Sequence, residues 1–355
     1  MGLFSRKEEN NDSRQARFKG LSGSAFGLDL GTWSFRLYNS QTDRVLVERN
    51  MIAVRGRNTM IAYGDEAFEM YEKAPSGIQV SFPMGGGVIA DIRNMEMLVR
   101  EFIRDEQRGS FRPADYYISI PTDVTEVERK AFCDLIREAG IRARNIFGVE
   151  RAVADCLGLG IDVMNSQGIL IVDVGYDTTE VSVLSFGGIV LSKILKVGGH
   201  TFDTAIVNAV RKEQNLQIGM KTAEKIRISA DRTDSYGADQ TVYGRDILSG
   251  LPVERTLPGE FIIETLSDLY SQIAGDTRIL LERTPPELSA DIYRQGIYIT
   301  GGASQSETLT NLMQQEVHRI VNIASDPVCS AVIGLGQIIR NRSLLPLVFT
   351  IEGLA

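Results

Sequence analysis

Phe26-Gly-Leu-Asp29-Leu30-Gly31-Thr32 and Leu170-Ile-Val-Asp173-Val174-Gly175-Tyr-Asp-Thr178-Thr179 are two copies of one pattern. Each copy is a short apolar run that ends in Asp, an apolar residue and Gly, followed by a hydroxyl side chain. An apolar strand ending in this way places a carboxylate and a tight turn at the edge of a sheet. The exposed backbone N–H groups and hydroxyls of such a turn suit a phosphate group. The repeat therefore predicts a duplicated chain whose two halves grip one nucleotide from both sides.

The composition is that of a soluble globular protein of about two domains. The chain has 355 residues, of which 43% are hydrophobic and 24% are charged. Its net charge is −8, without a basic tract beyond the N-terminus. A surface that binds a nucleic-acid duplex needs clustered positive charge, so we expect no nucleic-acid partner.

Cysteine and histidine usage favours a reducing compartment and argues against a zinc site or a histidine-based triad. Cys133, Cys156 and Cys329 lie far apart without metal-ligand spacing, and His200 and His318 are equally isolated. The sequence contains neither a membrane-spanning apolar run nor a signal peptide. We therefore expect a cytoplasmic protein.

Residues 1–24 are polar and mixed in charge, which predicts a flexible N-terminal tail. Leu3 and Phe4 lie beside Arg6 and Lys7 and form a weak candidate membrane contact. A frayed chain start explains the same residues, and the sequence leaves both readings open.

The order of predicted elements repeats once along the chain. Each half reads as a β-meander, a helix, a strand and a helix, which implies two α/β lobes with a cleft between them. We expect capping of the second helix by the pair Asp123 and Glu126, and a later helix that starts at Asp203. The predicted strands are 25–30, 35–38, 45–47, 116–120, 169–173, 180–184, 188–192 and 297–300, and the predicted helices include 94–107, 221–230, 261–282, 304–321 and 330–340, the last with glycines that allow close packing.

Asp29 and Asp173 are the candidate metal residues. Carboxylates paired near phosphates usually act through Mg²⁺ and its waters, because the metal offsets their repulsion with the anion. The alternative is that both aspartates only cap turns. Four hydroxyls follow the aspartates and would take phosphate oxygens: those of Thr32, Ser34, Thr178 and Thr179.

A third glycine turn, Thr300-Gly301-Gly302-Ala303-Ser304, lacks side-chain bulk, so its backbone could lie against an adenosine. Glu224 and Lys225, on a helix that opens at Lys221-Thr222, could contact a purine or a ribose. The alternatives are an ordinary turn and a solvated helix face.

From about residue 25 to about residue 342, the chain resembles the MreB family of bacterial actins, the rod-shape-determining proteins, as a divergent member. The resemblance rests on motifs spread over both halves: Asp29-Leu-Gly-Thr32, Gly87-Val-Ile-Ala-Asp91, Glu126-Val-Glu-Arg129, Asp173-Val-Gly-Tyr-Asp-Thr-Thr-Glu-Val181, Phe186-Gly-Gly-Ile-Val190, Leu216-Gln-Ile-Gly219, Thr222-Ala-Glu224 and Thr300-Gly-Gly302.

This resemblance implies an α/β, actin-like two-lobed fold of duplicated ribonuclease-H-like domains with smaller inserted subdomains. Lobe I would comprise residues 25–165 and 325–355, with an insertion at about 50–82. Lobe II would comprise residues 166–324, with an insertion at about 205–265.

The resemblance also implies a function: ATP and Mg²⁺ in the cleft, and polymerisation into filaments at the inner face of the cell membrane that guide the cell-wall elongation machinery. By motif, the nucleotide-binding residues would be Asp29, Gly31, Thr32, Trp33, Ser34, Asp173, Gly175, Tyr176, Asp177, Thr178, Thr179, Thr222, Glu224, Lys225, Gly301, Gly302, Ala303 and Ser304.

The two phosphate loops depart from the family pattern. The family's first loop, Asp-Leu-Gly-Thr-Ala-Asn-Thr, reads here Asp-Leu-Gly-Thr-Trp33-Ser34-Phe35. The family's second loop, Asp-Ile-Gly-Gly-Gly-Thr-Thr, has Tyr176 and Asp177 in place of two glycines. Glycine lets backbone approach phosphate, whereas Tyr176 adds bulk and Asp177 adds like charge. These changes predict weakened nucleotide binding.

The third departure concerns hydrolysis. The family has Glu-Glu-Pro where this chain has Glu150-Arg151-Ala152, so Arg151 takes the position of the glutamate that positions the attacking water. A guanidinium cannot accept a proton near neutral pH, although it can bind phosphate. Glu150 could serve instead, but neighbouring helix positions point about 100° apart. We therefore expect slow or absent hydrolysis.

Two alternative functions remain. A degenerate actin-fold scaffold would bind partners without forming its own filaments, which the altered second loop favours. A small-molecule kinase on the same fold is less favoured, because no aspartate can be singled out as a hydroxyl-activating base.

Overall fold

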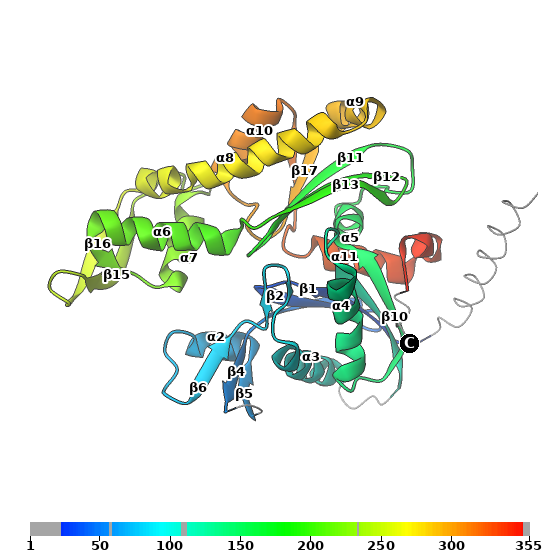
Figure 1. The fold of residues 1–355 in the computed structure, drawn as a ribbon, viewed down its shortest axis with the longest axis horizontal. Coiled ribbons are helices and arrows are strands. Elements are labelled where there is room, and N and C mark those ends of the chain that lie inside the picture. Colours follow the sequence, from blue (N-terminus) through cyan, green and yellow to red (C-terminus); the bar gives the residue numbers. More distant parts are fainter. Residues whose placement is uncertain (1–22, 57–58, 108–111, 233, 351–355) are drawn as a thin grey trace, which may run out of the picture.

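The computed structural model describes residues 23–56, 59–107, 112–232 and 234–350, and they form two lobes, each built on a five-stranded mixed sheet (Figure 1). In the first sheet the strand order is β10 (Ala143–Glu150), β9 (Ala114–Ile120), β1 (Ala25–Leu30), β2 (Ser34–Asn39) and β3 (Arg44–Arg49). In the second sheet the order is β13 (Gly188–Leu195), β12 (Thr179–Ser185), β11 (Ile169–Val174), β17 (Ile297–Thr300) and β18 (Val321–Ile323).

The two sheets share one topology. In each sheet the motif-bearing strand, β1 or β11, pairs antiparallel with the next strand and parallel with a later one. The predicted duplication and the predicted two-lobed α/β fold are confirmed.

Two smaller sheets lie toward the left of Figure 1, one in each lobe. The first contains β5 (Thr59–Tyr63), β4 (Ile52–Arg55) and β6 (Ile78–Ser81), with helix α2 (Gly64–Met70). The second contains β14 (Leu216–Gln217), β15 (Gln240–Asp246) and β16 (Pro252–Leu257), next to α6 (Gly199–Gln214) and α7 (Met220–Ala230). A short hairpin pairs β7 (Met84–Gly85) with β8 (Val88–Ile89). The predicted lobe and insertion boundaries remain a prediction.

Helices α5 (Arg151–Gly158) and α11 (Ser330–Arg340) lie between the two large sheets (Figure 1). Their backbones touch at two glycines. A Cβ on Gly334 would lie 1.8 Å from the carbonyl oxygen of Ala154, and one on Gly158 would lie 2.0 Å from that of Ser330. These short distances confirm the expected close packing of helix 330–340. A larger residue at either glycine would clash with backbone.

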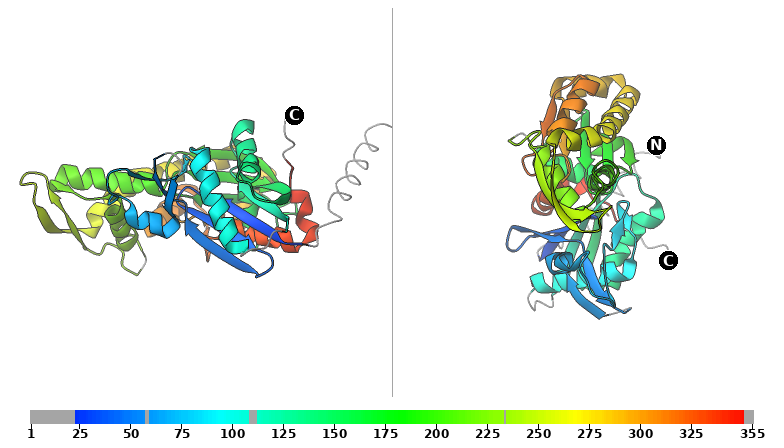
Figure 2. Two further views of the ribbon diagram at one scale, coloured as in Figure 1. Left: turned by 90° about the horizontal axis from the view of Figure 1, so that it is seen from below. Right: turned by 90° about the vertical axis from the view of Figure 1, so that its left-hand side faces the viewer.

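The remaining helices cover the outer faces of the lobes, as the two turned views of Figure 2 show. They are α3 (Ile92–Gln107), α4 (Glu126–Glu138), α8 (Gly259–Arg283), α9 (Pro286–Gln295) and α10 (Glu307–Val317), whereas the 3₁₀ helix η1 (Arg342–Leu347) packs against the core between the sheets. Each lobe has its own apolar core, and a third core between the sheets involves α5 and α11. The expected apolar stripe of helix 94–107 is buried in the core of the first lobe: Met95, Leu98, Val99, Phe102 and Ile103.

Three local expectations are wrong. Helix α4 is capped by Thr125, whose hydroxyl accepts from the backbone N–H of Glu128, rather than by Asp123 and Glu126. Helix α6 begins at Gly199, four residues before Asp203. Helix α10 ends at Val317 and not at residue 321. Capping signals overlap in polar stretches, and the backbone path decides which hydroxyl reaches an N–H group.

Within the described part of the chain, no helix is both long enough and apolar enough to cross a membrane. Residues 1–22, which hold most of the predicted flexible tail and the candidate anchor at Leu3, Phe4, Arg6 and Lys7, lie outside the described residues.

Candidate functional site

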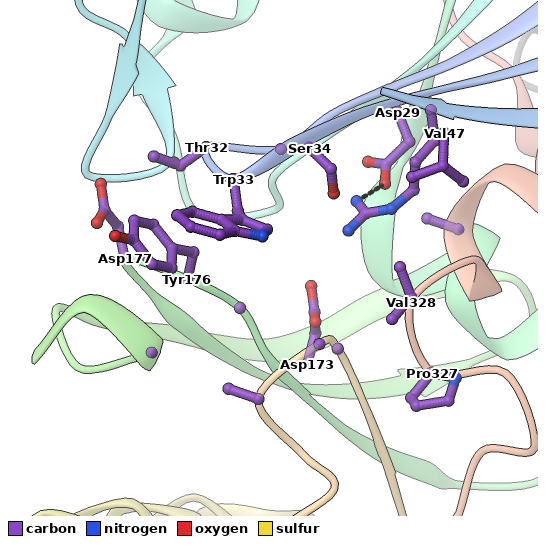
Figure 3. Close-up of a pocket in the computed structure, with 18 of the residues that line it drawn as sticks. Asp29, Thr32, Trp33, Ser34, Val47, Asp173, Tyr176, Asp177, Pro327 and Val328 are labelled. Atoms are coloured by element: carbon purple, nitrogen blue, oxygen red, sulfur yellow. Dashed lines mark hydrogen bonds and ion pairs between the residues drawn. The ribbon is translucent and has the colours of Figure 1, made fainter. Parts of the chain in front are cut away.

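A cavity of about 380 Å³ lies between the lobes, at the ends of the two motif-bearing strands. Both lobes line it. The first contributes residues of β1, β2 and β3 and the start of α5, and the second contributes the turn after β11, part of α7 and the turn after β17. Figure 3 shows Asp29 and Asp173 projecting into this space from opposite sides.

The two copies of the repeated motif form the same turn. The N–H of Gly31 donates to the carbonyl of Ser34 at 3.2 Å, and the N–H of Gly175 donates to the carbonyl of Thr178 at 2.9 Å. The duplication thus extends to an equivalent hydrogen bond, and both turns face one cavity.

Most of the predicted site residues line this cavity. They are Asp29, Gly31, Thr32, Trp33, Ser34, Arg151, Asp173, Gly175, Tyr176, Asp177, Thr178, Glu224, Gly301, Gly302 and Ala303. Their contact with a nucleotide remains a prediction.

Five predicted residues are not among those that line the cavity: Glu150, Thr179, Thr222, Lys225 and Ser304. Thr179 donates its hydroxyl to the carbonyl of Val197 at 2.8 Å, and Ser304 is fully buried. Lys225 is exposed on α7. Glu150 accepts from Arg129 at 2.6 Å, which engages the carboxylate considered as a substitute base.

Both carboxylate oxygens of Asp29 have partners. Arg36, directly opposite on β2, donates to Oδ2 at 2.7 Å, and Ser119 on β9 donates to Oδ1 at 2.6 Å. Nε of Arg151 lies 3.6 Å from Oδ1. Burial alone would raise the pKa of Asp29, but the two guanidinium groups and the Ser119 hydroxyl lower it below its ordinary value.

Arg151 opens helix α5 and lies within an acidic neighbourhood. Its Nη2 donates to the carbonyl of Leu30 at 3.2 Å, and 11% of its side chain is exposed. Burial would lower the pKa of Arg151, but nearby carboxylates raise it above the ordinary value, so the guanidinium is charged. These carboxylates, in order of influence, are Asp29, Asp173, Glu180 and Asp155.

The pKa values of Asp173 and Asp155 are raised, whereas that of Asp29 is lowered. Burial raises the pKa of Asp173 to about 6, with repulsion from Glu180 and Asp29 adding to the effect and Arg151 opposing it. Burial and the neighbouring Asp173 raise the pKa of Asp155 well above its ordinary value. Asp155 accepts from the hydroxyl of Ser330 at 2.6 Å.

Aromatic rings close one end of the cavity (Figure 3). Trp33 from the first lobe packs on Tyr176 from the second, with ring centroids 4.5 Å apart, and Tyr176 stacks on His200 at 5.4 Å. Asp177 accepts from the backbone N–H of Gly86 at 2.8 Å, across the two lobes. The residues that replace the family's small loop residues therefore bridge the lobes.

Gly301 has φ +92°, and a Cβ there would lie 2.3 Å from Oδ1 of Asp173. By contrast, a Cβ on Gly302 would meet no described atom within 4 Å. The turn after β17 therefore needs glycine at 301 to pass Asp173, while Gly302 faces open space.

Three arginines line the cavity that the sequence did not predict as site residues: Arg36, Arg49 and Arg227. A signal existed for Arg36, because a single charged residue interrupts the otherwise apolar run of Phe35-Arg-Leu-Tyr38. Arg227 pairs with buried Asp203 at 2.6 Å, a contact that depends on how α6 and α7 pack.

Asp29 already binds groups of the protein, and its predicted contact with Mg²⁺ through water stays a prediction. Its two oxygens already bind Arg36 and Ser119, and two guanidinium groups balance its charge. Among the described residues, no group of three or more Asp, Glu, His or Cys side chains is arranged to hold a metal ion. Asp173 remains available on the opposite side of the cavity.

The duplicated sheets with a nucleotide-sized cavity between them define an actin-like protein. Mbl of Bacillus subtilis strain 168, a cell shape-determining protein, is 33% identical over 324 residues, which cover 90% of this chain and 97% of Mbl. MreB5 of Spiroplasma citri bound to ADP has a TM-score of 0.84 and 33% identity, covering 91% of this chain and 99% of MreB5.

The MreB5 structure bound to AMPPNP is similar, with a TM-score of 0.83, 31% identity and coverage of 92% and 98%. MamK, solved as a double helical filament, shares the fold at 20% identity, with a TM-score of 0.75 and coverage of 90% and 99%. The family profile described as MreB/Mbl protein matches residues 23–345. This chain therefore belongs to the MreB/Mbl family of cell shape-determining proteins.

Proposed function

We propose that this chain is an MreB-type filament protein that binds an adenine nucleotide in the cleft between its lobes. The observation that carries the proposal is the pair of equivalent turns at Gly31 and Gly175, which face one cavity from opposite lobes. Turns of this kind present backbone amides and hydroxyls to phosphate. The MreB5 structures, bound to ADP and AMPPNP, support the same ligand class.

The proposed assembly is a filament of this chain on the inner surface of the cell membrane, where it organises cell-wall synthesis. Membership of the cell shape-determining family supports this role, and the filament of MamK supports self-association on this fold. We place the protein in the cytoplasm, peripheral to the membrane.

We further propose that ATP hydrolysis is slow or absent. Arg151 stands where the family has its water-positioning glutamate, and a guanidinium has no lone pair with which to orient or deprotonate water. Glu150, the neighbouring carboxylate, is paired with Arg129 instead of facing the cavity.

Electron microscopy and sedimentation of the pure chain test the filament proposal. We expect filaments that sediment above a critical concentration with ATP or AMPPNP, in the presence of vesicles that contain anionic lipid. A chain that stays monomeric with ATP, with ADP and without nucleotide, at every salt concentration tried, would show that the proposal is wrong.

A measurement of phosphate release tests the proposal of slow or absent hydrolysis. Fast ATP turnover that Arg151→Ala leaves unchanged would contradict the role proposed for Arg151.

One observation favours a second function, an actin-fold scaffold that binds partners without forming its own filaments. Trp33 and Tyr176 pack against each other across the cleft, where the family has small loop residues. Calorimetry with ATP separates the two functions, because the scaffold predicts no detectable heat of nucleotide binding.

A further inference from the structure

Asn50 directly follows strand β3 and is fully buried beside the first of the two turns. Its side-chain amide donates to the carbonyl of Gly31 at 2.8 Å. Its backbone N–H donates to the carbonyl of Trp33 at 3.0 Å. Gly31 and Trp33 line the cavity, whereas Asn50 is not among the lining residues. One residue outside the lining therefore holds two carbonyl groups of this turn.

The second turn is held in a comparable way by backbone alone. The N–H of Gly199 donates to the carbonyl of Gly175, the motif glycine of this copy, at 3.0 Å. The N–H of His200 donates to the carbonyl of Tyr176 at 2.7 Å. Both donors belong to the first turn of α6, where N–H groups have no acceptor within the helix. Strand β13 leads into α6, whereas β3 leads into β4, so in the first lobe the donors come from Asn50.

The bond to Gly31 fixes the direction of a whole peptide group. A trans peptide is planar, so its C=O and its N–H point in opposite directions. Because the carbonyl of Gly31 points to Asn50, the N–H of Thr32 points away from Asn50, and Thr32 lines the cavity. A phosphate then meets a turn that is already oriented, which avoids the entropy cost of ordering it on binding.

The donor side of the Asn50 amide is the part that the turn uses. Its Oδ1 is buried and has no hydrogen-bond partner among the described residues. A buried amide oxygen without a donor lowers stability, and an apolar side chain would avoid that cost. The bond from Nδ2 to the carbonyl of Gly31 is therefore what this amide contributes at a fully buried position.

We propose that Asn50 is a positioning residue of the nucleotide site, whose side-chain amide orients the first turn for a phosphate group. This inference rests on the proposed nucleotide binding. It assigns to one side chain in the first lobe the role that the start of α6 has in the second.

The test compares Asn50→Ala with the unmodified full chain in calorimetric titrations with ADP and with AMPPNP, in the presence of Mg²⁺. Fluorescence of Trp33, the chain's only tryptophan, gives an independent measurement of binding. Asn50→Ala should weaken binding by about five- to fiftyfold, because the ligand must then order a turn whose Gly31 carbonyl has lost its donor.

Asn322→Ala is the matched control, because it also removes a side-chain amide that donates to backbone. Asn322 donates to the carbonyls of Gln295 at 3.0 Å and Ile297 at 3.2 Å, and it does not line the cavity. Thermal melting should show a loss of stability in both variants. Nucleotide affinity should stay within about twofold of the unmodified chain in Asn322→Ala, because distant sites act independently.

Asn50→Asp separates the positioning role from a purely structural one and also serves if Asn50→Ala does not fold. A protonated carboxyl group can donate to the Gly31 carbonyl, whereas a carboxylate cannot and repels it. The affinity of Asn50→Asp relative to the unmodified chain should therefore fall as the pH rises from about 5 to about 8, because burial raises a carboxyl pKa toward this range. Asn322→Asp should show no such fall.

Two outcomes would overturn the inference while the proposed nucleotide binding stands. One is an Asn50→Ala variant that binds both nucleotides as tightly as the unmodified chain. The other is a relative affinity of Asn50→Asp that does not change over this pH range. An unmodified chain that binds neither nucleotide would instead refute the proposed function, and this inference with it.

Discussion

Asp29 and Asp173 occupy equivalent positions in the two motif copies, yet their surroundings shift their pKa values in opposite directions. Asp29 has two guanidinium neighbours and a hydroxyl donor, which outweigh the effect of burial and lower its pKa. Burial dominates at Asp173 and raises its pKa to about 6. The two motif copies are therefore alike in sequence but differ in electrostatic surroundings, because the charges beside each aspartate come from residues outside the motif.

Asp173→Asn should stabilise the nucleotide-free protein at pH 8. A carboxyl group whose pKa is raised on folding stabilises the folded state at low pH and loses that contribution as pH rises from about 4 through about 6. The asparagine variant lacks this loss, so its free energy of unfolding should exceed that of the unmodified chain by about 1–2 kcal/mol above pH 6 and match it near pH 4. Urea unfolding across this pH range measures the difference.

Asp29→Asn is the control, because its free energy of unfolding should change in the opposite direction. A lowered pKa stabilises the folded state above the unfolded pKa of about 4, so this variant should be destabilised at pH 7 and should approach the unmodified chain as the pH falls. A loss of stability in Asp173→Asn at pH 8 would mean that attraction to Arg151 outweighs burial.

At the scale of elements, α5 and α11 cross between the two large sheets in backbone contact. Gly334→Ala forces a methyl group against the carbonyl oxygen of Ala154, 1.8 Å away, and backbone cannot move aside as a flexible side chain can. We expect this variant to lose at least about 2 kcal/mol of unfolding free energy. Thermal melting of the full chain measures it.

Gly275→Ala is the matched control, because Gly275 lies within α8 and a Cβ there would meet no described atom within 4 Å. Alanine at an open helix position should stabilise the chain by about 0.5–1 kcal/mol. Equal effects of the two variants would show that the α5–α11 contact carries no special constraint.

At the scale of the whole molecule, contacts between α2 with the turn after it and the start of α7 span the cleft. Helix α7 begins after Gly219 without a side-chain cap, and Glu72 from the other lobe accepts from the backbone N–H of Met220 at 3.3 Å. The ammonium group of Lys221 lies 3.9 Å from the ring centroid of Phe68, also in the other lobe. A carboxylate at a helix N-terminus and a cation on a ring are both favourable contacts, so we expect them to favour a closed cleft.

Glu72→Ala should speed nucleotide dissociation by about two- to fivefold, because an acid at a helix N-terminus contributes about 0.3–1 kcal/mol. Stopped-flow fluorescence of Trp33 measures the rate, and small-angle scattering of the nucleotide-free chain should show a larger radius of gyration. Lys212→Ala is the control, since Lys212 is exposed on the neighbouring helix α6 and does not line the cavity. Equal dissociation rates in Glu72→Ala and the unmodified chain would show that this contact does not hold the cleft closed.

Sequence alone predicted the duplicated lobes, the strand that precedes each aspartate and the glycine contact of the last helix. These features depend on local pattern: apolar runs, helical spacing and turn residues act over a few neighbouring positions. The caps of α4 and α6 were misplaced, because several polar residues near each helix start satisfy the same local rule.

The charges that face the cleft depend on long-range packing, which local sequence patterns do not reveal. Arg36 faces Asp29 through the register of β1 and β2, and Arg151 reaches the same carboxylate from a helix in a distant part of the chain. The closure by Trp33 and Tyr176 likewise requires the two lobes to be placed against each other. The amino-acid sequence predicts the two lobes and the turn on each side of the cleft, because local patterns specify strands and turns. Which charges face the cleft depends on register and lobe packing, which long-range contacts set.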